Sequence, residues 1–438
     1  MGRYVVSTPE EQREMLAALG FSSMQELYHD VPRELMLDTL HLPKGKSELE
    51  TRRDMEALAA ENHVFRHIFR GAGAYHHYIP AAVRQIPTKE EFLTAYTPYQ
   101  AEISQGILQS IFEYQTMICE LTGMDVSNAS VYDGASAAAE AVAMCRNKKR
   151  QRVLLSSACS PDLLRVVQTY CFASDTEVLL IPEKDGRTDE AALAAMLDET
   201  VSCVLLQQPN YFGQIEPAEA MTQAVHAAGA LMILSCNPIA AALLKTPGEC
   251  GADIAVGEGQ PLGMPLAFGG PYLGFMAAKS SLMRKLPGRI VGETTDADGN
   301  RAFVLTLQAR EQHIKREKAS SSICSNQALC ALTASVYMSA MGPEGMRETA
   351  VQCYSKAHYA ANAISSVPGF SLVHSGDFFH EFVTACPVPA DALLRALEDR
   401  DILGGLALSG NNLLWCVTEM NSREEIDLLV SVLKEVSC

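Results

Sequence analysis

Seven short apolar runs lie in the middle of the chain, between about residues 128 and 278. Their sequences are ASVYD, RVLLSS, EVLLIP, CVLLQQ, ALMILS, DIAVG and YLGFMAA, and each is too short for a helix. Segments with helical periodicity, such as TDEAALAAMLDET and PAEAMTQAVHAAGA, separate the earlier runs. Because continuous apolar strands that alternate with helices are buried on both faces, this pattern predicts one large α/β domain around a mostly parallel, seven-stranded sheet.

The segments before these runs have a helical pattern instead. Thr8 with Glu11 and Thr88 with Glu91 each predict a capped helix start, and SELETRRDMEALAAEN predicts a helix between them. The stretch GAGAYHHYIP, residues 71–80, has too much glycine and aromatic content for a regular element, and we expect a loop. The stretch YTPYQAE then breaks the chain before a long amphipathic helix.

The pattern changes again after the last apolar run. The stretch RIVGETTDADGNRAFVLTLQ predicts a hairpin with Asp298 and Gly299 at its turn. Gly342 and Pro343 separate two predicted helices, and short strands alternate with helices in the remainder. The predicted domains are a helical arm with interface loops in residues 1–95, a large α/β domain in 96–305 and a smaller α/β domain in 306–438.

The charge balance excludes some classes of partner. The 438 residues include 35 basic and 52 acidic side chains, so the formal net charge is 35 − 52 = −17. Such a surface repels phosphate backbones and anionic lipids, and we expect no nucleic acid and no membrane as partners. No apolar run has the length of a membrane span, and thirteen scattered cysteines without a CxxC pair are typical of free thiols. The expected location is therefore the cytoplasm.

One stretch has the pattern of an anion site. In VYDGASAAAEA, residues 131–141, a predicted strand is followed by a tight turn at Asp133 and Gly134 and by a helix that starts near Ser136. Backbone N–H groups at a helix start, beside a small hydroxyl residue, can hold an anion. Two interpretations fit these residues, a phosphate cradle and the simple capped helix of an α/β domain, and the local sequence leaves both open.

Three further patterns carry weaker signals. The stretch GEGQPLG has the wrong spacing for a dinucleotide loop, because Gly263 comes one residue too late and Pro261 interrupts it. His63 and His67 have the spacing of metal ligands on a helix, but no HExxH pattern or cysteine cluster supports them, and we expect no metal site. The stretch REQHIKREK, residues 310–318, is either a solvated helix face or a source of cations for a cleft between domains.

Four longer stretches span the chain. In order they are GAGAYHHYIP, TAYTPYQAEISQGILQSIFEYQTMICELTGMDVSNASVYDGASAAAEA, TPGECGADIAVGEGQPLGMPLAFGGPYLGFMA and REQHIKREKASSSICSNQAL. Jointly they resemble the alpha subunits of glycine cleavage system P-proteins. The resemblance implies the aspartate-aminotransferase-like fold of pyridoxal-phosphate (PLP) enzymes, known as fold type I. That fold agrees with the helical arm, the seven-stranded domain and the smaller C-terminal α/β domain predicted above.

The resemblance also implies that this chain lacks the lysine that binds the cofactor. In the related beta subunit, a strand ending in aspartate leads, eight residues on, to that lysine, and eight residues after Asp253 stands Pro261. Proline has no amine with which to form the bond. The aspartate that normally protonates the pyridine nitrogen is also missing, because the corresponding region holds Ser235, Cys236 and Asn237. The expected remnant of the PLP pocket is Asp133, Gly134, Ser136, Asn237 and Pro261.

The assembly that the resemblance implies has two alpha and two beta subunits, with PLP in the beta subunit and none bound covalently by this chain. In the implied reaction, glycine loses carbon dioxide and its aminomethyl group passes to the lipoyl arm of the H-protein. The loops before the large domain are expected to reach the partner. The candidate contributors to the partner's active site are Tyr75, Tyr96, Tyr99 and Gln100.

Two alternatives remain open beside this hypothesis. A self-sufficient PLP enzyme would use a non-standard lysine, for which Lys245 and Lys279 are the candidates near the glycine-rich loop. A purely structural subunit would contain no complete active site.

Overall fold

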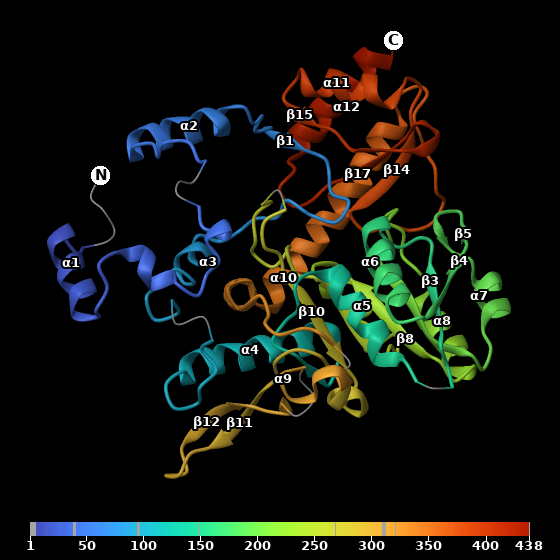
Figure 1. The fold of residues 1–438 in the computed structure, drawn as a ribbon. Coiled ribbons are helices and arrows are strands. Elements are labelled where there is room, and N and C mark those ends of the chain that lie inside the picture. The colour runs from blue at the N-terminus through green and yellow to red at the C-terminus, as the bar shows by residue number, and fades with distance from the viewer. Residues whose placement is uncertain are drawn as a thin grey trace. The chain divides into compact units, whose positions relative to one another are not determined.

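The computed structural model describes residues 6–37, 41–93, 97–147, 149–267, 269–308, 312–319 and 321–437. The chain divides into two compact units, Met1–Val64 and Phe65–Cys438. Figure 1 shows the helices and strands of both. The finer division of the chain at residues 95 and 305 stays a prediction.

The first unit consists of short helices with almost no core. The helices are α1 (Pro9–Ala18), the 3-10 helices η1 (Met24–Tyr28) and η2 (Arg33–Leu35), and α2 (Glu48–Ala60). The predicted capping box at Thr8 and Glu11 is confirmed, and Ser47 forms another box at the start of α2. Leu16 is the only buried side chain among the described residues of this unit. Local capping, rather than burial of apolar surface, therefore determines α1 and α2.

A seven-stranded sheet forms the centre of the second unit, as the apolar runs predict. Its strands, in order across the sheet, are β2 (Val126–Ser127), β10 (Gly274–Ala278), β9 (Ile254–Glu258), β8 (Leu231–Cys236), β7 (Val201–Gln208), β3 (Arg152–Ser156) and β4 (Glu177–Ile181). Strand β10 is antiparallel to both of its neighbours, and the other pairs are parallel.

Helices cover both faces of this sheet. The covering helices are α4 (Gln105–Thr122), α5 (Gly134–Cys145), α6 (Pro161–Phe172), α7 (Glu190–Met196) and α8 (Ala218–Ala227). In β7, Cys203 and Leu205 belong to the apolar cluster with α5 and α6, whereas Val204 and Leu206 belong to the cluster with α8. Since successive side chains of a strand point to opposite faces, a continuous apolar run is what a doubly covered strand requires.

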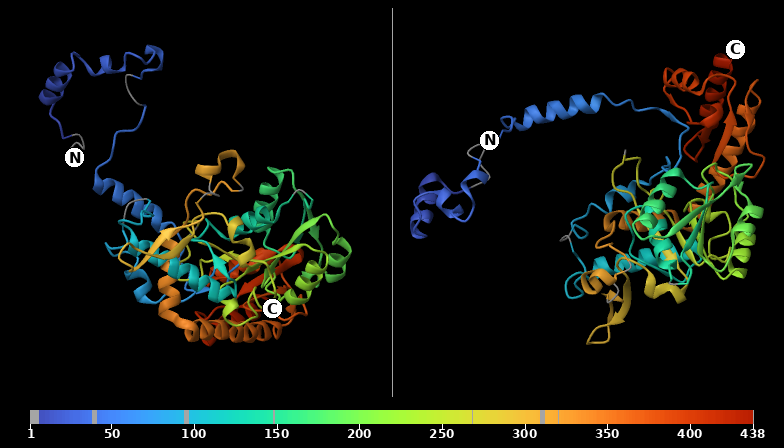
Figure 2. Two further views of the ribbon diagram at one scale, coloured as in Figure 1. Left: turned by 90° about the horizontal axis from the view of Figure 1, so that it is seen from below. Right: turned by 45° about the vertical axis from the view of Figure 1, so that its right-hand side comes forward.

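A second, antiparallel sheet lies in the C-terminal part, with the order β13 (Ser371–Leu372), β14 (Glu381–Ala385), β17 (Asn412–Cys416) and β16 (Leu406–Leu408). The helices of this part are α10 (Ala328–Ser365), α11 (Ala390–Glu398) and α12 (Arg423–Ser437). Helix α10 bends at Gly342, whose φ of 63° is not helical, and Figure 2 shows the bend. The predicted break at Gly342 and Pro343 is therefore a kink between two helical halves.

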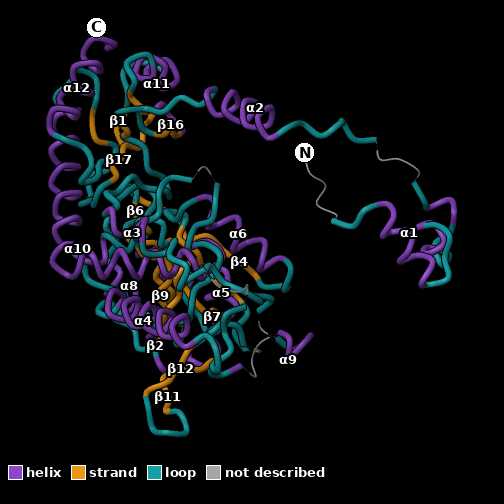
Figure 3. The backbone as a smooth tube through the Cα atoms, turned by 90° about the vertical axis from the view of Figure 1, so that its left-hand side faces the viewer, coloured by secondary structure: helices purple, strands orange, loops and turns teal. Residues whose placement is uncertain are grey.

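The predicted hairpin is confirmed as β11 (Val291–Thr295) and β12 (Arg301–Leu305), which Figure 3 shows extending from the second unit. The remaining elements of this unit are β1 (His67–Ile68), α3 (Ala81–Gln85), β5 (Glu183–Lys184), β6 (Arg187–Thr188), η3 (Ala240–Ala242), η4 (Ser280–Lys285), α9 (Gln312–Lys315), η6 (Arg316–Lys318), β15 (Ile402–Leu403) and η7 (Ser409–Asn411). No helix in the described part of the chain combines the length and the apolar character needed to cross a membrane.

Three local predictions were wrong. Residues 88–93 form turns instead of a helix, because the Thr88 hydroxyl donates to the Gln85 carbonyl and so ends α3. The run ASVYD contributes only an isolated bridge from Val131 to Gly274, and the paired strand lies earlier, at Val126–Ser127. His67 lies in β1 and pairs with Ile402, so His63 and His67 do not lie on one helix.

We expect Gly257→Ala to destabilise the protein by about 1–3 kcal/mol, because a Cβ atom there would overlap the Cys236 carbonyl and the Phe275 ring in the sheet interior. Gly292→Ala is the matched control, since the nearest atom to its added Cβ, on Thr306, is 3.4 Å away. Urea or thermal unfolding measures both variants. Equal stability of the two would contradict this account of the sheet interior.

Candidate functional site

A cavity of about 380 Å³ lies at the carboxyl ends of the parallel strands. Loop residues 71–75, the start of α5 and the start of β14 line it, together with Asn237 after β8 and Glu258 at the end of β9. Ligands of open α/β sheets bind at this edge, because the loops that follow the strands converge there. The cavity is therefore the candidate functional site of the second unit.

The start of α5 is held by carboxylates of the chain itself. Asp133 caps the helix, since its side chain accepts hydrogen bonds from the Ser136 backbone N–H at 2.7 Å and from the Ser136 hydroxyl at 3.1 Å. The carboxylate of Glu258 accepts the Gly134 N–H at 3.0 Å. Two carboxyl groups of the chain itself thus occupy the helix start for which the sequence left a phosphate cradle and a capped helix open.

Glu258 lines the cavity and was missed by the sequence analysis. Besides Gly134, its carboxylate accepts the backbone N–H groups of Gln260 at 3.0 Å and Leu273 at 3.1 Å. Burial raises the pKa of Glu258 to about 7, against the lowering effect of these hydrogen bonds, and the nearby Asp133 adds to the increase. A glutamate as the last residue of a buried strand was the sequence feature that could have identified it.

The position at which the resemblance implies that a lysine is missing, Pro261, lies in the turn after β9. Pro261 is buried in that turn and is not among the residues that line the cavity. Next to it, the Gln260 side chain accepts the Tyr75 N–H at 2.8 Å and donates to the Tyr75 carbonyl at 2.9 Å. Asp253 directly precedes β9, in agreement with the predicted run DIAVG, and the strand ends at Glu258.

The two alternative lysines are engaged away from the cavity. Lys245 donates to Glu219 at 2.6 Å on the surface. Lys279 donates to Asp253 at 2.8 Å and to the Gly251 carbonyl at 2.9 Å. Neither residue lines the cavity.

Tyr75 is the predicted interface tyrosine that the structure brings to the cavity. Its hydroxyl donates to Glu381 at 2.8 Å, and the Ala72 N–H donates to the other carboxylate oxygen at 2.6 Å. Burial, followed by the charge of Glu381, raises the pKa of Tyr75, and burial raises the pKa of Glu381 to about 7. The buried ring of His380 packs against Tyr75, with centroids 4.6 Å apart, and burial lowers its pKa to about 3. His380 is therefore a neutral imidazole.

The other predicted contributors lie elsewhere. The Tyr99 hydroxyl donates to Asn326 at 2.8 Å, and the Arg289 guanidinium lies 5.1 Å from the centroid of its ring. Gln100 is exposed, and neither residue lines the cavity. Tyr96 lies outside the described residues. His313 and Lys318 of the charged stretch do not line the cavity either, and Arg310 is not among the described residues.

The cavity has a one-sided charge. The carboxyl groups that line it are those of Asp133, Asp162, Glu258 and Glu381, and its described lining contains no lysine or arginine. A phosphate or another anion would meet these groups without a cation to balance it. The geometry favours neutral or cationic ligands over anionic ones.

Comparison with known proteins identifies the family. The family model described as glycine cleavage system P-protein matches residues 2–433. A Moorella thermoacetica protein named "Probable glycine dehydrogenase (decarboxylating) subunit 1" is 50% identical, with 99% of each chain covered. A Desulfitobacterium hafniense protein of the same name is 48% identical, also with 99% of each chain covered.

A solved structure gives the same result. A crystal structure of glycine decarboxylase, the P-protein of the glycine cleavage system, superposes with a TM-score of 0.93 at 41% identity and covers 99% of this chain and 100% of its own. The expected aspartate-aminotransferase-like fold of PLP enzymes is confirmed. The chain belongs to the family of glycine cleavage system P-proteins.

Proposed function

We propose that this chain is the alpha subunit of a two-component P-protein, whose complex decarboxylates glycine and transfers the aminomethyl group to the lipoyl H-protein. The observation that carries the proposal is the end-to-end match to relatives named as subunit 1 of glycine dehydrogenase (decarboxylating). The complex contains two alpha and two beta subunits and acts in the cytoplasm.

PLP belongs to the beta subunit in this proposal, and the residues of the alpha cavity do not fit it. A phosphate group needs free N–H groups or cations, but Glu258 accepts the Gly134 N–H and the described lining includes no lysine or arginine. Pro261 stands where the family's lysine is expected, and Asn237 stands where an acid is expected. When bound by the partner, PLP supplies the electron sink for decarboxylation. The alpha chain therefore supports the reaction without performing that step.

The self-sufficient enzyme is the weaker alternative. An amine that forms a bond to a carbonyl must be near the cofactor and unprotonated, whereas Lys245 and Lys279 are both paired with carboxylates outside the cavity. Of the residues proposed to complete the partner's site, Gln100 is exposed and available for contact, and Tyr75 faces the cavity of its own chain. The roles of Tyr96 and Tyr99 remain part of the proposal.

Contact with the beta subunit accounts for the exposed apolar surface of the first unit. Large apolar side chains there are strongly exposed, among them Leu19, Leu37, Leu42, Met55 and Leu58. Apolar surface of this extent is typical of interaction sites. We propose that residues 6–64 bury this surface against the beta subunit.

Reconstitution tests the function directly. The isolated chain is expected to show no exchange between glycine and labelled carbon dioxide, because it holds no electron sink. Mixing with the beta chain and lipoyl H-protein should restore exchange, whereas the beta chain and H-protein without this chain should have much lower activity. Full exchange by the beta chain alone would overturn the proposed role.

The cofactor assignment has its own test. After incubation with PLP, borohydride reduction and peptide mapping, we expect the label on a lysine of the beta chain and no specific label on this chain. The beta chain in the same sample is the positive control. Stoichiometric label on Lys245 or Lys279 would instead establish the self-sufficient enzyme.

Assembly is expected to depend on the exposed face of α2. Met55→Glu places a charge on a side chain that is 53% exposed in this chain and proposed to be buried in the complex, so the Kd for the beta chain should rise about tenfold or more. Ala57→Glu adds the same charge to another side of the helix and is the control. Analytical ultracentrifugation measures both, and an unchanged Kd for Met55→Glu would contradict the proposed contact.

A further inference from the structure

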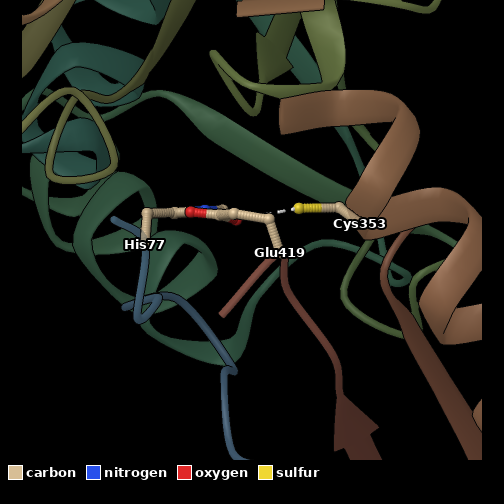
Figure 4. Close-up of side chains that lie close together, drawn as sticks. All are labelled: His77, Cys353 and Glu419. Atoms are coloured by element: carbon tan, nitrogen blue, oxygen red, sulfur yellow. Dashed lines mark hydrogen bonds and ion pairs between the residues drawn. The ribbon is translucent and has the colours of Figure 1, made fainter. Parts of the chain in front are cut away.

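Three residues far apart in sequence meet in the interior of the second unit. His77 lies in the loop before α3, Cys353 in the second half of α10, and Glu419 in the loop between β17 and α12. Figure 4 shows their side chains pointing toward one another, with Glu419 in the middle. His77 Nδ1 lies 2.8 Å from Glu419 Oε2, the Cys353 thiol donates to the same oxygen at 3.3 Å, and one ligand atom of each residue lies within 4.8 Å of the others.

We propose that His77, Cys353 and Glu419 bind a zinc ion. Imidazole nitrogen, thiolate sulfur and carboxylate oxygen are the ligand types that zinc prefers, whereas magnesium and calcium require oxygen ligands throughout. A tetrahedral zinc site holds its ligand atoms roughly 3.3–3.8 Å apart. In this cluster the separations are 2.8 Å from His77 to Glu419 and 3.3 Å from Cys353 to Glu419, and the third is at most 4.8 Å. The sequence analysis expected no metal site, and these three ligands share no local spacing that could have indicated one.

The cluster is closed to solvent, which separates it from ordinary acidic surface groups. His77 is 5% exposed and Cys353 is fully buried, while the Glu419 side chain is 13% exposed. The second oxygen of Glu419 accepts the Tyr78 N–H at 2.6 Å, which fixes the carboxylate in place. Hydrogen bonds of this kind orient the ligands of metal sites.

A second histidine stands beside the cluster. His380 is 1% exposed, its ring centroid is 6.4 Å from that of His77, and neither of its ring nitrogens has a hydrogen-bond partner among the described residues. Buried polar atoms without partners are rare in folded proteins. His380 is not among the residues whose ligand atoms lie within 4.8 Å of one another, so a water molecule would be the fourth ligand and could hydrogen-bond to the His380 ring.

Charge balance also favours the ion. Without a metal, the Cys353 thiol donates its proton in a hydrogen bond to the Glu419 carboxylate. Zinc would displace the thiol proton to solvent and bind thiolate, carboxylate and neutral imidazole. The two ligand charges then equal the charge of the ion, and the buried carboxylate is neutralised.

Such an ion would join the loop that carries Tyr75 to α10 and to the C-terminal sheet. Residues 71–75 of that loop line the cavity, and His77 lies two residues further along the chain. Zinc would therefore fix one wall of the cavity to the C-terminal part of the unit. This inference concerns the chain's own residues and does not depend on the proposed function.

The test is zinc retention by the full-length chain, alone and in complex with the beta chain. After loading with zinc sulfate and dialysis against a chromophoric chelator, we expect about one zinc per chain by elemental analysis. Cys353→Ser keeps a hydroxyl that can donate to Glu419. Because it removes a metal ligand, it should weaken zinc binding by more than the roughly 10–100-fold loss that follows when a hydrogen-bond partner of a ligand is removed. Cobalt in place of zinc should give a sulfur-to-metal charge-transfer band that Cys353→Ser removes.

Cys171→Ser is the matched control, because it makes the same change at a buried cysteine of a different apolar cluster and should keep one zinc. Glu419→Gln provides a second ligand variant that should also lose the ion, and thermal melts of all variants verify folding. Zinc at background in the loaded wild-type chain would overturn the proposal. Equal zinc retention by the wild-type chain and the folded ligand variants would overturn it as well.

Discussion

The carboxylate of Glu258 accepts backbone N–H groups from three separate segments, and the arrangement of the cavity depends on this interaction. It joins the start of α5 through Gly134, the turn after β9 through Gln260 and the start of β10 through Leu273. The Gln260 side chain then holds the backbone of Tyr75, whose hydroxyl holds Glu381. One buried acid therefore connects the sheet, the N-terminal loop and the C-terminal sheet.

The same interaction bears on the roles proposed for the alpha and beta subunits. The Gly134 N–H at the start of α5 is satisfied by a carboxylate inside the chain, so this donor needs no bound anion as its partner. The proposed alpha subunit would then serve as a framework, while the beta subunit supplies the chemistry.

The sequence predicts those parts of the structure that depend on local patterns. Continuous apolar runs identify doubly covered strands, and Thr8 with Glu11 or Asp298 with Gly299 identify a cap and a turn, because each acts over a few residues. Thr88 misled the prediction because its hydroxyl serves the end of one helix as readily as the start of another. The site was harder to predict. Tyr75 meets Glu381 across 306 residues, and no local spacing records such a contact.

The two carboxyl groups with raised pKa values have a thermodynamic consequence. Glu258 and Glu381 each bind a proton more tightly in the folded chain, with pKa values of about 7, than at their ordinary value of 4.5. Folding therefore takes up protons between pH 4.5 and pH 7. The stabilisation that the two protonated carboxyl groups provide is complete below pH 4.5 and is lost as the pH rises through 7. Near neutrality the two carboxyl groups are partly protonated. Binding of any ligand or partner that changes the hydration of the cavity will therefore make these groups release protons to the solution or take protons up from it.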